Sequence, residues 1–279
     1  MTSRTIRSLH SAVRDDIQDL VTRRPLPGPG LPQVDPFLFL NHHGPQTYPA
    51  NNRGLPFGPH PHRGFETVTF ILAGSLAHLD SGSGASVVEA GGVQWMTAGS
   101  GLVHAELSPD EFKRSGGPLE ILQLWVNLPA RLKMTDPAYV PVSSTDMAGN
   151  TPGDGVSIRT VSGTPDSPIR SLTDVMLAIV SIEPGGRATL PAPSERNVLF
   201  YTIDGEAEIG QREVPRHTLA HLTEGDRIEI SSKSGCRILF GHASPIGEPV
   251  VAHGPFVMNS EAEIAQAVRD YQAGRFGGL

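Results

Sequence analysis

The sequence predicts an all-β protein built from two similar halves. Its 279 residues include 31 glycines and 25 prolines but only 18% charged residues, which is typical of short strands joined by tight turns. Apolar runs of strand length alternate with turn signals along most of the chain. The pattern of the first half returns in outline in the second half, which indicates an internal duplication.

In the first half, strands are expected where β-branched and aromatic residues cluster between glycine-containing turns. Residues 4–24 fit helical and strand periods only in part, so periodicity alone does not decide their structure. His78 shares a strand face with Leu76 and Asp80, and we expect it to be half-exposed rather than a ligand. The clearest expected strands are residues 37–40, 66–72, 93–96 and 119–128.

A segment rich in proline and glycine, from Pro129 to Gly155, separates the two halves. We place the boundary near residues 140–155, which gives one domain at 1–140 and another at 141–279. Near the C-terminus, Ser260 and Glu263 have the spacing of a capping box, so a short helix is expected to begin there. Its apolar face is expected to dock on a β domain; the residues on that face are Ile264, Ala267, Val268 and Tyr271.

Four side chains that can bind a metal lie in two short motifs. His60 and His62 form His-x-His, and His104 and Glu106 form His-x-Glu. Because residues two apart on a strand point to the same face, each motif presents both of its side chains to one side. A lone strand histidine is more often a surface or hydrogen-bonded residue, so the prediction depends on the two matched pairs. Three imidazoles and one carboxylate suit Fe(II), Mn, Co, Ni, Cu or Zn better than Mg or Ca.

At these motifs the sequence resembles the pirin family of the cupin superfamily. The resemblance is carried above all by residues 60–69 and 93–99, and it extends over nearly the whole chain. It implies two tandem cupin-type β-barrels, a bicupin, with a short C-terminal helix and with strands in residues 4–24. It also implies that the metal carboxylate is Glu106, although many cupins use the position of Glu66. The chain departs from the general cupin pattern at Gly74, which comes one residue late.

The pirin resemblance implies a bound metal, with iron(II) as first choice, and the quercetin 2,3-dioxygenase activity that some pirins show. That reaction opens a flavonol ring with O2, and Glu106 could accept the proton of the flavonol hydroxyl. Glu66 shares the sequence parity of His60 and His62, so it is a second candidate acid or base; alternatively it binds Arg63 or backbone amides. Two other functions remain open: an iron-dependent regulator that binds a transcription factor or metabolic enzyme, and a metal-stabilised storage or structural cupin.

Aligning the glycine-bounded strands of the two halves gives each expected ligand a counterpart that cannot bind a metal. In this alignment Glu66 corresponds to Asn197, whose side chain is only a weak oxygen donor. We therefore expect one metal per chain, held by the first half. The other counterparts are Pro191 and Pro193 for the first histidine pair, and Ile238 and Phe240 for His104 and Glu106.

Composition limits the remaining possibilities. The net charge of −7 gives no electrostatic reason to bind DNA or RNA directly. No apolar run reaches membrane-spanning length, and the first residues lack the apolar core of a signal peptide. Cys236 is the only cysteine, which suits a reducing compartment. We expect a cytoplasmic monomer whose small-molecule partners are a flavonol and O2.

Overall fold

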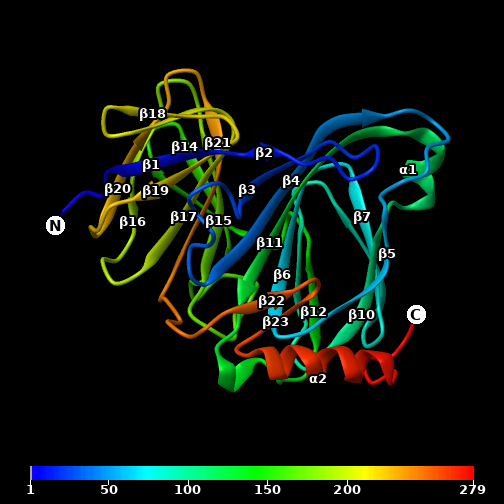
Figure 1. The fold of residues 1–279 in the computed structure, drawn as a ribbon. Coiled ribbons are helices and arrows are strands. Elements are labelled where there is room, and N and C mark those ends of the chain that lie inside the picture. The colour runs from blue at the N-terminus through cyan, green and yellow to red at the C-terminus, as the bar shows by residue number, and fades with distance from the viewer. Residues whose placement is uncertain (1) are drawn as a thin grey trace. The chain divides into compact units, whose positions relative to one another are not determined.

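Strands dominate the computed structural model, which describes residues 2–279 and divides into two compact units (Figure 1). The unit named barrel 1 comprises residues 14–23, 38–145 and 246–279. The unit named barrel 2 comprises residues 2–13, 24–37 and 146–245. The prediction of an all-β fold with two cupin-type barrels is confirmed, as is the prediction of strands in the N-terminal segment.

Two sheets form the wall of barrel 1. Its strands are β2 (Val13–Arg14), β3 (Thr22–Leu26), β4 (Phe37–Tyr48), β5 (Phe57–His62), β6 (Phe65–Ala73), β7 (Ser75–Asp80), β8 (Gly84–Glu89), β9 (Val93–Thr97), β10 (Leu102–Leu107), β11 (Gly117–Asn127) and β12 (Ala138–Val142). The larger sheet has the order β12-β9-β6-β11-β4-β3-β2, and the smaller one has the order β5-β10-β7-β8. Some neighbours, such as β7 and β8, are consecutive in sequence, but others are distant, and one of these pairings brings β5 next to β10.

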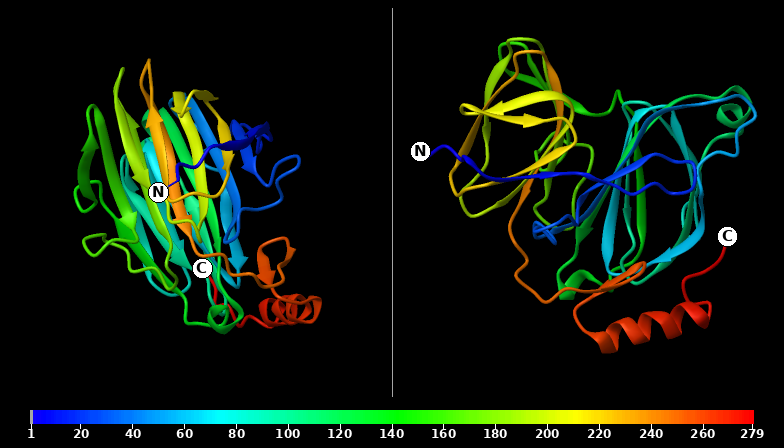
Figure 2. Two further views of the ribbon diagram at one scale, coloured as in Figure 1. Left: turned by 90° about the vertical axis from the view of Figure 1, so that its left-hand side faces the viewer. Right: turned by 45° about the horizontal axis from the view of Figure 1, so that its top comes forward.

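The C-terminal segment closes one end of barrel 1. It consists of the hairpin β22 (Val251–His253) and β23 (Phe256–Met258), followed by α2 (Glu261–Gln272), which lies beside the hairpin in Figures 1 and 2. Ile264 and Ala267 of α2 are buried in a cluster with Val103 of β10. Docking on a β domain is as expected for these two residues, and Val268 is partly buried, but Tyr271, also expected on the buried face, is 41% exposed. Barrel 1 also contains the short helices α1 (Asp110–Ser115) and η1 (Ala130–Leu132).

The predicted capping box at the start of α2 is present with one change. The Ser260 hydroxyl accepts a hydrogen bond from the Glu263 amide at 3.3 Å. The Glu263 carboxylate reaches back to the Asn259 amide at 3.0 Å, one residue before the expected Ser260 amide. The first of these contacts satisfies a donor that the first turn of a helix leaves free.

Barrel 2 repeats this architecture around an apolar interior. Its strands are β1 (Ile6–Ser11), β13 (Ala148–Gly153), β14 (Val156–Ser162), β15 (Met176–Ile182), β16 (Arg187–Pro191), β17 (Asn197–Ile209), β18 (Arg212–Pro215), β19 (Thr218–Leu222), β20 (Arg227–Ser231) and β21 (Cys236–Ala243). The main sheet has the order β1-β19-β17-β21-β15-β14-β13, and β20 pairs with both β16 and β17. The core includes Val180, Phe200 and Ile238, all fully buried.

The two barrels exchange segments from the ends of the chain. β1 pairs with β19 in barrel 2, and the C-terminal segment after residue 245 belongs to barrel 1. The chain passes from barrel 1 to barrel 2 between Thr145 and Asp146, inside the stretch where the sequence places a boundary. The compact units therefore differ from the contiguous domains 1–140 and 141–279, because strand pairing at each end recruits residues from the opposite half.

Strand pairing also corrects the residues that correspond between the halves. In barrel 1, His60 on β5 is opposite His104 on β10; in barrel 2, Leu190 on β16 is opposite Ile228 on β20. The counterparts by topology are Leu190, Ala192, Ile228 and Ile230, and not Pro191, Pro193, Ile238 and Phe240.

The glycine alignment made two errors. It was shifted by one residue at β16, and it matched β10 with β21, although the strand pairing makes β21 the counterpart of β11. The inference that barrel 2 lacks the ligands is unaffected, since all four topological counterparts are apolar and buried.

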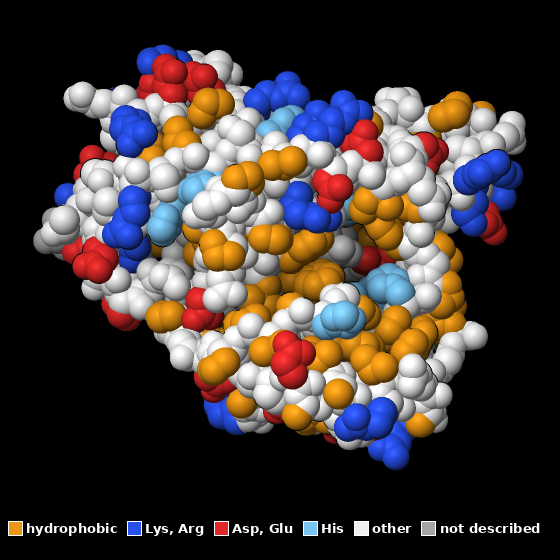
Figure 3. All heavy atoms as spheres, viewed as in Figure 1, with side chains coloured by type: hydrophobic (Ala, Val, Ile, Leu, Met, Phe, Trp, Pro, Cys, Tyr) orange, Lys and Arg blue, Asp and Glu red, His pale blue; other side chains and the backbone are white. Residues whose placement is uncertain are grey.

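Charged side chains of both signs lie on the surface. On the face in Figure 3, basic and acidic side chains are interspersed over most of the surface. Among residues 2–279, neither helix has the length and apolarity needed to cross a membrane.

We predict that Gly205→Ala destabilises the protein more than Gly210→Ala. Both glycines have positive φ, +65° and +62°, so each substitution costs roughly 1–2 kcal/mol of backbone strain. A Cβ on Gly205 would lie 2.1 Å from the Gly235 carbonyl oxygen, whereas one on Gly210 meets no atom within 4 Å. Overpacking should therefore add roughly 1–3 kcal/mol at Gly205 alone. Urea unfolding of both variants measures the difference, and equal losses would contradict the account.

Candidate metal centre

Three of the four predicted ligands converge between two neighbouring strands of barrel 1. His60 and His62 lie on β5, and His104 lies on β10 directly opposite His60. One ring nitrogen from each lies within 4.8 Å of the other two. The ring centroids are 4.4 Å apart for His60 and His104, 4.8 Å for His60 and His62, and 5.0 Å for His62 and His104. Among the described residues, this group has the chemistry and spacing of a metal centre.

Hydrogen bonds to carbonyl oxygens fix the tautomers of the two β5 histidines. The Nδ1 of His60 lies 2.7 Å from the Gly58 oxygen, and the Nδ1 of His62 lies 3.3 Å from the Pro255 oxygen. Because a carbonyl oxygen can only accept, each Nδ1 carries the hydrogen and each Nε2 keeps a free lone pair. This is the arrangement that orients metal-bound histidines in other proteins.

His104 is fully buried, and neither of its ring nitrogens has a hydrogen-bond partner within the protein. A buried polar nitrogen without a partner is costly, roughly 1–3 kcal/mol. A metal ion bound by this imidazole would remove that cost. The donor set therefore fits a divalent transition metal held by His60, His62 and His104.

The buried imidazoles of His62 and His104 are both held in the neutral form that binds metals. Burial, and then the neighbouring His60, lowers the pKa of His62 to about 3. Burial also lowers the pKa of His104 well below its usual value, followed by the effects of His62, His60 and His78.

Glu106 lies two residues after His104 and is 2% exposed, but its carboxylate is not part of the three-histidine group. Its Oε1 accepts hydrogen bonds from the Thr69 hydroxyl at 3.1 Å and from the Gln94 amide, and its Oε2 accepts one from the Gln123 amide. These three contacts fix the orientation of the carboxylate. The role of Glu106 as fourth ligand stays a prediction.

The three side chains that hold Glu106 were not singled out from the sequence. They lie on three adjacent strands: Thr69 on β6 is opposite both Gln94 on β9 and Gln123 on β11. Each is a polar residue with an apolar residue on both sides in a largely buried strand, which is the signal that could have identified them. A buried polar side chain needs a partner, and here the partner is a carboxylate.

Glu66 lies on the opposite face of the sheet from Thr69 and Gln94. Its Oε1 accepts hydrogen bonds from Trp95 Nε1 at 2.9 Å and Thr97 Oγ1 at 2.7 Å. Glu66 is an even number of residues after His60 and His62, but side-chain alternation cannot be counted across the turn between β5 and β6. The reason for expecting Glu66 beside the histidines is therefore wrong. Burial raises the pKa of Glu66, while the two hydrogen bonds act in the opposite direction.

His78 is 1% exposed, and the expectation that it is half-exposed is wrong. It lies opposite Glu106 in the strand pairing, and its ring centroid is 5.4 Å from that of His104. Its Nε2 lies 2.8 Å from an oxygen of Asp80, and its ring stacks on Tyr139 at 3.8 Å. The smaller sheet therefore places a third β-strand, β7, beside the metal centre.

Aromatic side chains cover the side of the centre next to His62. The Trp125 ring lies 5.4 Å from the His62 ring and 4.4 Å from the Phe65 ring. Phe39 lies 4.7 Å from Trp125 on its other side. This apolar surround limits water near His62 and strengthens electrostatic interactions there.

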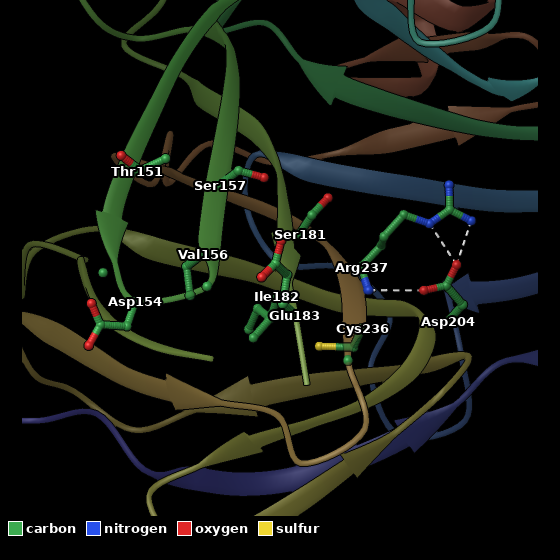
Figure 4. Close-up of a pocket in the computed structure, with 13 residues that line it drawn as sticks. Thr151, Asp154, Val156, Ser157, Ser181, Ile182, Glu183, Asp204, Cys236 and Arg237 are labelled. Atoms are coloured by element: carbon green, nitrogen blue, oxygen red, sulfur yellow. Dashed lines mark hydrogen bonds and ion pairs between the residues drawn. The ribbon is translucent and has the colours of Figure 1, made fainter. Parts of the chain in front are cut away.

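A cavity of about 770 Å³ lies in barrel 2 and has different chemistry (Figure 4). An ion pair between Arg237 and Asp204 forms part of its wall, and no histidine lines it. Burial raises the pKa of the Cys236 thiol in this wall to about 11, which makes the thiol a poor nucleophile. This cavity therefore does not have the three-histidine group found in barrel 1.

Comparison with known proteins identifies relatives along the full chain. Two family models match: Pirin over residues 19–126 and Pirin C-terminal cupin domain over residues 177–277. Human pirin is 36% identical over 265 residues, which cover 91% of this chain and 87% of the human protein.

Solved structures agree with these family matches. A quercetin 2,3-dioxygenase from Acinetobacter baumannii has a TM-score of 0.91 at 30% identity, with 99% of both chains covered. A bacterial pirin from Escherichia coli in complex with nickel(II) shares the fold, with a TM-score of 0.69 at 20% identity and coverage of 85% of this chain and 99% of that one.

We predict that His62 makes the metal-free protein less stable in acid. Its pKa is about 3 in the folded state and near 6.5 in the unfolded chain, so the unfolded state binds the proton first as the pH falls. The stability is present above about pH 6.5 and decreases towards pH 3, by up to about 1.4 kcal/mol per pH unit.

Urea unfolding of the chelated protein and of His62→Phe, each at neutral pH and near pH 5, measures this effect. The raised pKa of Glu66 makes the free energy of unfolding change with pH in the opposite direction, but it does so in both proteins. The difference between their pH dependences therefore reports the effect of His62. Parallel pH dependences in the two proteins would contradict the prediction.

Proposed function

The chain belongs to the pirin family, and on that premise we propose that barrel 1 binds one divalent metal ion and cleaves a flavonol such as quercetin with O2, as a 2,3-dioxygenase. The observation that supports this most strongly is His104, whose two buried ring nitrogens have no partner among the protein groups around them. A quercetin 2,3-dioxygenase is also among the structures most similar to this chain.

We propose His60, His62 and His104 as nitrogen ligands and Glu106 as the carboxylate ligand. Iron(II) is the proposed metal, because three nitrogens and one oxygen leave two positions of an octahedral ion open for substrates. When bound, the metal would supply a Lewis acid for an oxygen atom of the flavonol.

Glu106 is the proposed base for the flavonol hydroxyl. Its Oε1 accepts two hydrogen bonds and its Oε2 accepts one, so one acceptor position remains on Oε2, and Glu106 would have to release one of these donors to serve as both metal ligand and base. The Thr69, Gln94 and Gln123 donors would hold the carboxylate of Glu106 in a fixed orientation. The aromatic side chains beside His62 would exclude water from the planar, apolar substrate.

We predict that Glu106→Gln loses most flavonol cleavage, whereas Glu66→Gln keeps it. Both substitutions remove one buried carboxylate and preserve its shape, but only Glu106 lies on the face that holds the histidines. Loss of a general base typically lowers the rate roughly 10²–10⁴-fold. Flavonol loss and oxygen uptake are measured for both variants and the unsubstituted protein at matched metal occupancy.

Equal cleavage by Glu106→Gln and the unsubstituted protein would show that Glu106 is not the base. If the unsubstituted, metal-loaded protein cleaves no flavonol, the enzyme proposal fails for this substrate class. The iron-dependent regulator would then be the better account, and its test would be metal-dependent binding of a protein partner.

A further inference from the structure

The C-terminal segment of barrel 1 contacts the backbone of the strand that carries His60 and His62. Arg63 pairs with Phe256 of β23: the Arg63 amide lies 3.4 Å from the Pro255 oxygen, and the Val257 amide donates to the Arg63 oxygen at 3.1 Å. The same Pro255 oxygen accepts the hydrogen bond from His62 Nδ1. One short strand therefore holds both the backbone after His62 and the ring of His62 itself.

The turn after His62 is shaped to allow this close approach. Gly64 has a φ of +89°, and a Cβ there would lie 2.0 Å from the Val257 oxygen. Lys133, which is 1% exposed, donates to both the Gly64 oxygen at 2.8 Å and the Val257 oxygen at 3.1 Å. Its buried ammonium joins the turn and β23 through two carbonyl groups that would otherwise face each other.

A buried ion pair connects the same turn to α2. Arg63 is 4% exposed, and its Nη1 lies 2.8 Å from Asp270 Oδ2. Its Nε donates to the Ser100 oxygen at 2.7 Å, close to the start of β10. The guanidinium lies over the Phe276 ring at 4.5 Å from the centroid. Arg63 thus contacts the helix, the C-terminal tail and the segment leading to His104.

The C-terminal tail also fixes the start of β10. A Cβ on Gly101, three residues before His104, would lie 2.6 Å from the Phe276 ring. The Ser81 hydroxyl donates to the Phe276 oxygen at 2.7 Å and accepts from the Val103 amide at 3.2 Å. Phe276 and Val103 are buried in one cluster with residues of α2.

We propose that the C-terminal segment, residues 246–279, is a positioning element for the metal centre, and that Asp270 acts on the ligands through Arg63. The proposal rests on the metal site proposed above. Through Arg63 and the Pro255 oxygen, the segment sets the orientation of His62; through Phe276 it sets the start of the strand that carries His104. The metal affinity of a group in the first half of the sequence therefore depends on residues at its end.

The test is titration of metal-free protein with Co(II), in which the visible absorption bands report both the affinity and the ligand geometry. Asp270→Asn keeps the shape of the side chain but removes the charge that pairs with both Arg63 and the exposed Arg275. Glu261→Gln makes the same charge change at an exposed position in the first turn of α2 and is the matched control. Phe276→Leu is a second variant, which loosens the tail without a charge change. Thermal melts of the metal-free proteins separate overall stability from metal binding.

We expect Asp270→Asn to weaken Co(II) binding roughly 10–100-fold and to alter the absorption bands, since loss of a group that orients a ligand has that effect elsewhere. Phe276→Leu should act in the same direction, and Glu261→Gln should match the unsubstituted protein. Unchanged affinity and bands in Asp270→Asn and Phe276→Leu, with only lower melting temperatures, would overturn the proposal and leave a purely structural role. Failure of the unsubstituted protein to bind Co(II) would instead contradict the metal site itself.

Discussion

The antiparallel pairing of β5 with β10 is the constraint on which the candidate site depends. This pairing places His104 opposite His60, and the alternation of side chains along β5 then adds His62 to the same side. A shift of one residue in the register would turn these imidazoles to the other face. The register is supported from both sides, because β10 also pairs with β7 and because the C-terminal segment binds the turn after β5 and the start of β10.

Barrel 2 contains the corresponding strand pair without the histidines, and it shows that the topology does not need them. In barrel 2, β16 and β20 meet in the corresponding register, but the inward positions are the apolar residues Leu190 and Ile228. Their side chains fill the interior through ordinary hydrophobic packing. In barrel 1, imidazoles and a carboxylate occupy this space, and their polar atoms need partners that aliphatic groups do not. The donors around Glu106 meet that need for the carboxylate, and a bound metal ion would meet it for the imidazoles. The same topology thus has polar residues inside barrel 1 and apolar residues inside barrel 2.

The sequence predicts the parts of this account that depend on local periodicity. Alternation within one strand correctly joins His60 with His62, and the turn signals correctly indicate an all-β chain. Parity fails where it is carried across a turn, as for Glu66, because the chain direction and face change between β5 and β6. The alignment of the two halves by their glycines is also wrong, as for Pro191, because strand pairing makes Leu190 the counterpart of His60. The contacts between Arg63 and Asp270 join residues 207 positions apart, and no local pattern encodes such a contact.

The central claim is that barrel 1 holds a single metal on its three histidines. Crystals of the iron-loaded protein, measured on both sides of the iron absorption edge, test it most directly through the anomalous difference map. The account predicts one peak per chain, about 2.1 Å from a ring nitrogen of each of His60, His62 and His104. A peak elsewhere in the chain, a second peak in barrel 2, or ring nitrogens turned away from the metal would contradict it.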